Sequence, residues 1–228
     1  MKIVHKYILI ISALLCTTQA FALPQAGEEP GPASGYTLVN PPQPLPSGTK
    51  IEVLEFFIYG CSHCFNLHPV LKEWGKKMPK DVVLVSVPVT FDSVNEVMAT
   101  TFYALGKLGK QKKLHDDLYY VWNVRNLDIL NEAAATDFVV QQGVDRQQFS
   151  AAFHAPATKL QVMNSQKMMK NYNIRSTPTL VVDGNYLISD LQTKDMVRVL
   201  DTVIAKARKE RKERKERKER KERAAKKH

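Results

Sequence analysis

The chain has 228 residues, 44% of them hydrophobic, and a formal net charge of +10 at pH 7. The charge is concentrated at the two ends. Residues 206–228 hold fourteen Lys and Arg against five Glu, and Lys2 and Lys6 add two more positive charges. The body between them is close to neutral, so overall charge gives no reason to expect nucleic-acid binding. A body of about 185 residues suits one domain, or one domain that carries an insertion.

Residues 1–22 have the pattern of a cleavable export signal. Two lysines precede an apolar run over residues 7–15, and Ala-Phe-Ala follows at 20–22 as a cleavage site. The run is too short to span a membrane, and the alternative is a retained anchor. Cleavage after residue 22 would remove Cys16, leaving Cys61 and Cys64 as the only cysteines.

Strand patterns begin after a proline-rich segment. Residues 23–49 hold seven of the twelve prolines, which predicts an extended linker, with a possible short edge strand at 36–39. The apolar run over 51–58 predicts a buried central strand. The run over 81–87 predicts a second strand, buried on both faces and ended by Pro88.

The chain is helical from about residue 93 to the next strand. Apolar residues recur at helical spacing, and Asp145 has the pattern of a helix N-cap. The predicted helices are 94–107, 110–122, 131–142, 146–153 and 157–171. Two apolar runs around Asp183-Gly184 then predict a hairpin, and a final helix is expected at 193–207.

The last 21 residues, 208–228, form a charged tail. Arg-Lys-Glu is repeated five times from Arg208, and Arg223 follows. Pairs such as Glu210 and Arg214 support a helix, because a Glu four residues before a basic residue lies beside it. We therefore expect a solvated extension of the last helix. The alternative is electrostatic attraction to an anionic membrane or another acidic surface.

The sequence Cys61-Ser62-His63-Cys64 lies where the central strand should pass into a helix. A Cys-x-x-Cys motif at such a junction is typical of thiol–disulfide redox chemistry. The unpaired N–H groups and the dipole at a helix N-terminus stabilise an anion, so Cys61 should have a lowered pKa and be the attacking thiolate. Cys64 faces the same side and can close the disulfide. His63 can add positive charge or a hydrogen bond.

A structural role for this cysteine pair is less favoured. A disulfide that closes so short a loop removes little entropy from the unfolded chain. In an exported protein with no other cysteine, we therefore expect Cys61 and Cys64 to be catalytic.

The chain resembles the DsbA family of bacterial periplasmic thiol–disulfide oxidoreductases. The resemblance rests on Val-Leu-Glu-Phe-Phe at 53–57, the Cys61–Cys64 motif, the long helical stretch, and Thr177-Pro178 before a Val-Asp-Gly-Asn-Tyr hairpin. It covers about residues 36–205. It implies an α/β thioredoxin fold interrupted by an inserted all-helical domain. Residues 50–92 and 157–207 would then form the thioredoxin-like domain, and 93–156 the insertion.

The resemblance also implies roles for individual residues. Cys61 would form the mixed disulfide with a client, and Cys64 would be shielded. Thr177-Pro178 would be the cis-proline loop, whose backbone at Thr177 pairs with an extended client segment.

Glu55 and Ser62 complete the candidate site. Glu55 matches the buried acid of thioredoxin-like proteins and would accept the proton of Cys64; the alternative is a solvated Glu. Ser62 stands where the best-known family motif has Pro, which leaves the redox potential open. We place it with Thr177 and Pro178 on the substrate-binding surface.

The function implied is a monomeric periplasmic oxidase that donates the Cys61–Cys64 disulfide to newly exported proteins. It would need no cofactor beyond that disulfide, and an inner-membrane partner of the DsbB type would reoxidise it. One alternative is a reductase or isomerase. Family isomerases need a dimerisation module, for which residues 23–49 are too short. Another is a metal carrier with Cys61, Cys64 and either His63 or His68 as ligands. We expect no bound metal.

Overall fold

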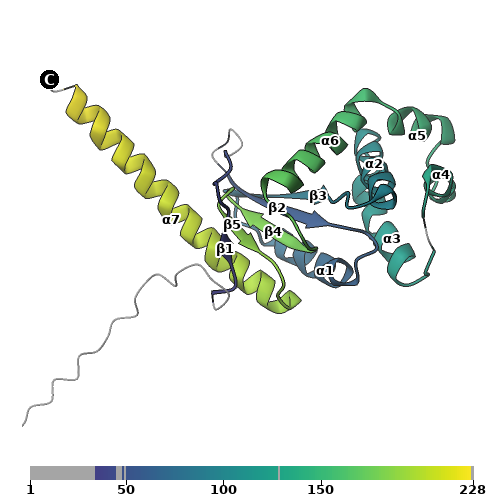
Figure 1. Ribbon diagram of the computed structural model, residues 1–228, viewed down its shortest axis with the longest axis horizontal. Coiled ribbons are helices and arrows are strands. Elements are labelled where there is room, and N and C mark those ends of the chain that lie inside the picture. Colours follow the sequence, from purple (N-terminus) through teal and green to yellow (C-terminus); the bar gives the residue numbers. More distant parts are fainter. Residues whose placement is uncertain (1–33, 45–47, 49, 128, 227–228) are drawn as a thin grey trace, which may run out of the picture.

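The computed structural model describes residues 34–44, 48, 50–127 and 129–226. Its centre is a sheet with the strand order β1-β5-β4-β2-β3 (Figure 1). β2 and β3 are parallel, and the other neighbours are antiparallel. The strands are β1 (Thr37–Leu38), β2 (Ile51–Phe57), β3 (Val82–Pro88), β4 (Thr179–Val182) and β5 (Tyr186–Ile188).

Helices cover both faces of the sheet, and alternate residues of β2 contact opposite layers, as expected for a strand. On one face, Ile51 and Val53 share an apolar cluster with residues of α1 (Ser62–Lys76) and α7 (Thr193–Ala225). On the other face, Leu54 and Phe56 pack with the end of α6 (Pro156–Asn171) and the residues that follow it. The strand is therefore buried on both sides, as the sequence predicts.

Between β3 and α6 the chain forms an inserted helical segment. Its helices are α2 (Ser93–Lys107), α3 (Gln111–Asn123), α4 (Glu132–Gln141) and α5 (Arg146–Phe153). Asp92, Asn131 and Asp145 cap three of these helices through their side chains. The apolar cluster of this segment includes Phe57 and Cys64. The expected α/β fold interrupted by helices is therefore present, and the insertion packs against the end of β2 that precedes the cysteines.

The prediction that strand 81–87 is buried on both faces is wrong. β3 is the edge strand of the sheet, and Val85 at its centre is 37% exposed. An apolar run alone does not distinguish a central strand from an edge strand. The strand ends at Pro88, as predicted, and includes that residue. An edge strand tolerates proline, which has no N–H group to donate.

The tail continues α7 as an exposed helix to Ala225, as predicted, but its first repeat also contacts the folded body. Arg208 donates two hydrogen bonds to Asp81, from Nε at 2.7 Å and from Nη2 at 3.1 Å. The Tyr186 hydroxyl on β5 donates to the Glu210 carboxylate at 2.5 Å. The helix is therefore fastened to the sheet beyond the predicted end at residue 207. Among the described residues, no helix is long and apolar enough to cross a membrane.

The most buried of the contacts between the tail and the folded body is the ion pair of Arg211 with Asp183. Asp183 is 1% exposed and lies in the turn between β4 and β5. Arg211 donates to it twice, with Nε 2.9 Å from Oδ2 and a second bond from Nη2 to Oδ1. A buried carboxylate is costly without a partner, so the second Arg-Lys-Glu repeat supplies a charge that the folded body needs.

We expect Arg211→Ala to lower the free energy of unfolding by about 2–4 kcal/mol, because it leaves Asp183 buried and unpaired. The lower part of that range allows for the partial exposure of Arg211. Urea denaturation measures the change. Arg214→Ala, one repeat further along the same helix, is the matched control and should stay within about 0.5 kcal/mol of the parent chain. Equal stability of the two variants would contradict the assignment.

Candidate active site

The two cysteines lie at the N-terminus of α1, where β2 has just ended. Cys61 is the N-cap residue, and its sulfur accepts a hydrogen bond from the backbone N–H of Cys64 at 3.4 Å. A sulfur here occupies the place of the oxygen that usually caps a helix. Cys61 is partly exposed, whereas Cys64 is fully buried. The sulfurs are not linked, so this is the reduced form.

This geometry separates the two thiols in acidity. A hydrogen bond from the Cys64 thiol lowers the pKa of Cys61 to about 5. Burial opposes the shift, while Thr177 and the backbone groups of Cys64 and His63 support it. For Cys64 the same hydrogen bond to Cys61, together with burial, raises the pKa. At neutral pH, Cys61 is therefore the thiolate and Cys64 remains protonated.

The loop before β4 lies against Cys61. The peptide bond between Thr177 and Pro178 is cis, as the resemblance implied. The Cys61 sulfur lies 3.3 Å from the carbonyl oxygen of Thr177, to which the thiol donates when it is protonated. The structure therefore brings Thr177 and Pro178, which are 116 and 117 residues away in sequence, to the reactive sulfur. Ser62 and His63 are exposed beside it in the first turn of α1.

Glu55 lies in the middle of β2 and is 2% exposed, so it is not the solvated Glu of the alternative interpretation. Its Oε2 accepts a hydrogen bond from the Ser86 hydroxyl at 2.8 Å. Oε1 has no hydrogen-bond partner among the described residues. Burial raises the pKa of Glu55, although Ser86 and the nearby His68 act in the opposite direction. A carboxyl group held this way can carry a proton at higher pH than a solvated Glu.

A cluster of aromatic and histidine side chains beside Glu55 was not predicted. The Tyr59 hydroxyl and His115 Nδ1 are hydrogen-bonded at 2.7 Å. His68 stacks on Tyr119, with ring centroids 4.7 Å apart, and its Nε2 lies 2.8 Å from an Asp116 oxygen. Burial lowers the pKa of His115 to about 3, so its imidazole is neutral.

This cluster connects the buried acid with the surface. A cleft of about 600 Å³ is lined by Ser86, the partner of Glu55, and by His68, His115 and Asp116. The buried hydroxyl of Tyr119 has no hydrogen-bond partner among the described residues. Burial raises the pKa of Tyr119, and electrostatic interaction with Glu55 and Cys64 raises it further. Nothing in the local sequence links α1 to α3, so only the fold could show this arrangement.

The inserted helices also hold the turn before Cys61. Asn123 of α3 donates from Nδ2 to the Tyr59 carbonyl oxygen at 2.7 Å. Trp122 packs on Gly60, where a Cβ atom would lie 3.2 Å from the indole ring. Close packing of this kind permits only glycine without a shift, so the insertion fixes the backbone next to the reactive residue.

The described residues show no ligand cluster that would support the alternative of a metal carrier. Within the part of the chain that the structure describes, no three His, Cys, Asp or Glu side chains are grouped as metal ligands would be. His68 contacts Asp116 and the aromatic rings rather than the cysteines. The site is therefore best described as a dithiol at a helix N-terminus in a thioredoxin-like fold.

Comparison with known proteins agrees with this class. The family model described as thioredoxin matches residues 47–202. The thiol:disulfide interchange protein DsbA of Bordetella parapertussis is 31% identical over 205 residues, covering 88% of this chain and 96% of the relative. DsbA of Burkholderia cepacia is 32% identical over 207 residues, covering 88% and 97%.

Solved structures give the same result. Pseudomonas aeruginosa DsbA has a TM-score of 0.74 at 28% identity, covering 78% of this chain and 94% of that structure. NmDsbA3 from Neisseria meningitidis has a TM-score of 0.68 at 28% identity, covering 78% and 97%. The chain belongs to the DsbA family of thioredoxin-fold proteins and is a thiol:disulfide oxidoreductase.

We expect Cys61 of the reduced protein to react with iodoacetamide with a pH midpoint near 5, because only the thiolate attacks. In the unfolded chain Cys61 keeps its proton up to the ordinary thiol pKa of 9.0. The unfolded state therefore binds more protons between these values, and the stability of the reduced protein should rise with pH from about 5 to 9.

Alkylation rates and urea denaturation across this pH range measure the two effects. Cys61→Ser is the control and should lose both of them. A reactivity midpoint at the ordinary thiol value would contradict the assignment of Cys61 as the stabilised thiolate.

Proposed function

We propose that the protein is a periplasmic oxidase that gives the Cys61–Cys64 disulfide to newly exported proteins. The observation that carries this proposal is the unequal pair of thiols, with the pKa of Cys61 lowered and that of Cys64 raised. Stabilising the Cys61 thiolate stabilises the reduced form, and a stable reduced form makes the disulfide a strong oxidant.

The reaction follows from this difference. A client thiolate attacks the Cys61 sulfur of the oxidised enzyme, and the bond between the two cysteine sulfurs breaks. Cys64 leaves and takes a proton, because its pKa is raised. A second client thiolate then attacks the client sulfur of the mixed disulfide. The client disulfide forms, and Cys61 leaves as the stabilised thiolate. The client has lost two electrons and the enzyme has gained them.

The surrounding residues support particular roles in this sequence. Glu55 is buried with a raised pKa, and Tyr119 interacts electrostatically with both Glu55 and Cys64, so Glu55 is suited to exchange the proton of Cys64. Thr177 and Pro178 lie at Cys61, where the backbone of Thr177 can pair with an extended client. Ser62 and His63 are exposed beside them and are suited to meet the client. A positive imidazole at His63 would further favour the thiolate.

Clients of varied sequence need a contact surface that does not depend on one side chain. A groove of about 490 Å³ has an apolar part formed by Phe65, Pro69, Tyr119 and Tyr120. Its other lining residues are polar or charged, namely Asn66, His68, Lys72, Asp116 and Asp117. Tyr120 is 51% exposed and Leu127, after α3, is 50% exposed. Exposed apolar groups beside a reactive site suit unfolded polypeptides.

The remaining parts of the proposal rest on the sequence patterns and on the family. Residues 1–22 would direct export and be removed. A membrane partner of the DsbB type would reoxidise the cysteines, and the Cys61–Cys64 disulfide would be the only redox group. We propose a monomer, with 50–92 and 157–207 as the thioredoxin-like domain, 93–156 as the inserted domain, and 23–49 as a linker.

The reduction potential in glutathione buffers tests the direction of the reaction. We expect a value toward the ~−120 mV typical of DsbA rather than the ~−270 mV of thioredoxin. A value near the latter would replace the oxidase by the reductase interpretation. His63→Ala should make the potential less oxidising if the imidazole supports the thiolate, and an unchanged potential would remove it from the mechanism.

Separate roles for the cysteines are tested by two matched variants. Cys61→Ser should abolish oxidation of a dithiol peptide, because the attacked sulfur is gone. In Cys64→Ser, Cys61 can still exchange with a client disulfide, but no second thiol remains to release it, so mixed disulfides should accumulate. Non-reducing electrophoresis detects them. Adducts in Cys61→Ser, or none in Cys64→Ser, would contradict these roles.

A further inference from the structure

The charged helix beyond Arg211 is the largest feature that the redox site does not use. Residues 212–226 contain nine Lys and Arg and four Glu, a net charge of +5. Apart from Glu216, which is partly buried, these residues are exposed. The ion pairs found here lie within the helix, and they join Lys215 to Glu219, Lys218 to Glu222 and Arg220 to Glu216. We call residues 212–226 the cationic arm.

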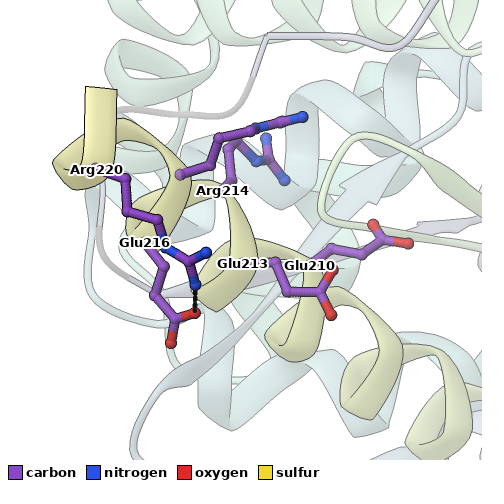
Figure 2. Close-up of a pocket in the computed structure, with 6 residues that line it drawn as sticks. Glu210, Glu213, Arg214, Glu216 and Arg220 are labelled. Atoms are coloured by element: carbon purple, nitrogen blue, oxygen red, sulfur yellow. Dashed lines mark ion pairs between the residues drawn. The ribbon is translucent and has the colours of Figure 1, made fainter. Parts of the chain in front are cut away.

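The three-residue repeat spreads charge around the arm. Successive residues of an α-helix are 100° apart around its axis, so a repeat of three residues covers 300°, which is 60° less than a full turn. The Arg, Lys and Glu of successive repeats are therefore each displaced around the helix. Figure 2 shows Arg214 and the Glu216–Arg220 ion pair pointing in different directions from the same helix. The groove of about 570 Å³ at this place is lined only by charged side chains of α7.

This pattern determines how the arm can bind a partner. A helix that inserts into a lipid interface needs an apolar face, and the arm has none. It has basic residues on every side and a positive net charge. The arm is therefore suited to an extended anionic surface that it touches through charge alone, with its Glu residues limiting the affinity.

The base of the arm is fixed, and this sets its direction. Arg208 is paired with Asp81 and Arg211 with buried Asp183, so the arm leaves the sheet as a continuation of α7. From Arg211 to Ala225 it extends by about 21 Å. In Figure 1 it points away from the inserted helices, whereas the N-terminus of α1 lies beside α3. The arm and the cysteines therefore lie at opposite ends of the molecule.

We propose that the cationic arm docks the enzyme reversibly on an anionic phospholipid surface, through a contact that does not involve the active site. The choice of lipid rests on the proposed export, because beyond the inner membrane the nearest extended array of phosphate groups is a bilayer. Docking of this kind holds the enzyme near the membrane while the active site remains open to clients.

Two charge variants of the full mature chain test the docking. Replacing Lys212, Lys215, Lys218 and Lys221 by Gln lowers the net charge of the arm to +1. The matched control replaces Glu213, Glu216, Glu219 and Glu222 by Gln, which raises it to +9. Both sets spare the ion pairs at the base and leave residues with similar helix propensity. Circular dichroism checks that both remain helical.

Binding is measured by co-sedimentation with vesicles containing phosphatidylglycerol and, separately, with vesicles of phosphatidylcholine alone. We expect the parent to bind only the anionic vesicles, the lysine variant to bind at least tenfold more weakly, and the glutamate variant to bind more tightly. At 1 M salt, where the Debye length is about 3 Å, binding should be lost.

Several results would overturn the proposal. These are no binding to anionic vesicles, equal binding of the two charge variants, binding that survives 1 M salt, or tighter binding to a DNA duplex than to the vesicles. Peptide oxidation in solution is measured on the same samples. Loss of vesicle binding with full oxidation would overturn only the docking, and vesicle binding without oxidation would overturn only the oxidase function.

Discussion

The hydrogen bonding of one sulfur, that of Cys61 at the start of α1, is the constraint on which the rest of the structure depends. The sulfur accepts a hydrogen bond from the backbone N–H of Cys64 and lies against the carbonyl oxygen of Thr177. For this to occur, β2 must end just before it, the Thr177 loop must return from the far side of the helical insertion, and Gly60 must fit beneath Trp122. The fold therefore brings the Thr177 loop to the sulfur and Trp122 to the turn before it.

Burial gives the second cysteine a different chemistry from the first. Cys64 is fully enclosed, and Tyr119 packs in the same cluster and interacts electrostatically with both Cys64 and Glu55. Tyr119 and Glu55 each have a polar atom that finds no partner among the described residues. Such atoms cost stability, about 1–3 kcal/mol each. Their presence beside a group that must gain and lose a proton fits a site in which stability is given up for reactivity. His68 and Asp116 link this interior with the surface cleft.

Local patterns were sufficient for the elements and for the reactive pair. The apolar run before Gly60 and the helical spacing after Cys64 depend on neighbours in sequence, so strand, helix and motif could be predicted together. The edge position of β3 could not be predicted in this way, because strand order is a property of the whole sheet. The contacts of His115 with Tyr59 and of Arg211 with Asp183 join segments far apart in sequence. Charge repeats alone predict solvation, and only the fold shows which repeat meets a buried acid.

The pairing of Arg211 with Asp183 makes completion of the fold depend on the second Arg-Lys-Glu repeat. A protein synthesised from its N-terminus exposes the β4–β5 turn before Arg211, the residue that pairs with its aspartate. Until Arg211 is present to pair with it, Asp183 is a carboxylate that cannot be buried at low cost in free energy. Burial of the β4–β5 turn is therefore favoured only once the second Arg-Lys-Glu repeat is available. A chain cut short before the second repeat would lack the counter-charge that its own interior requires.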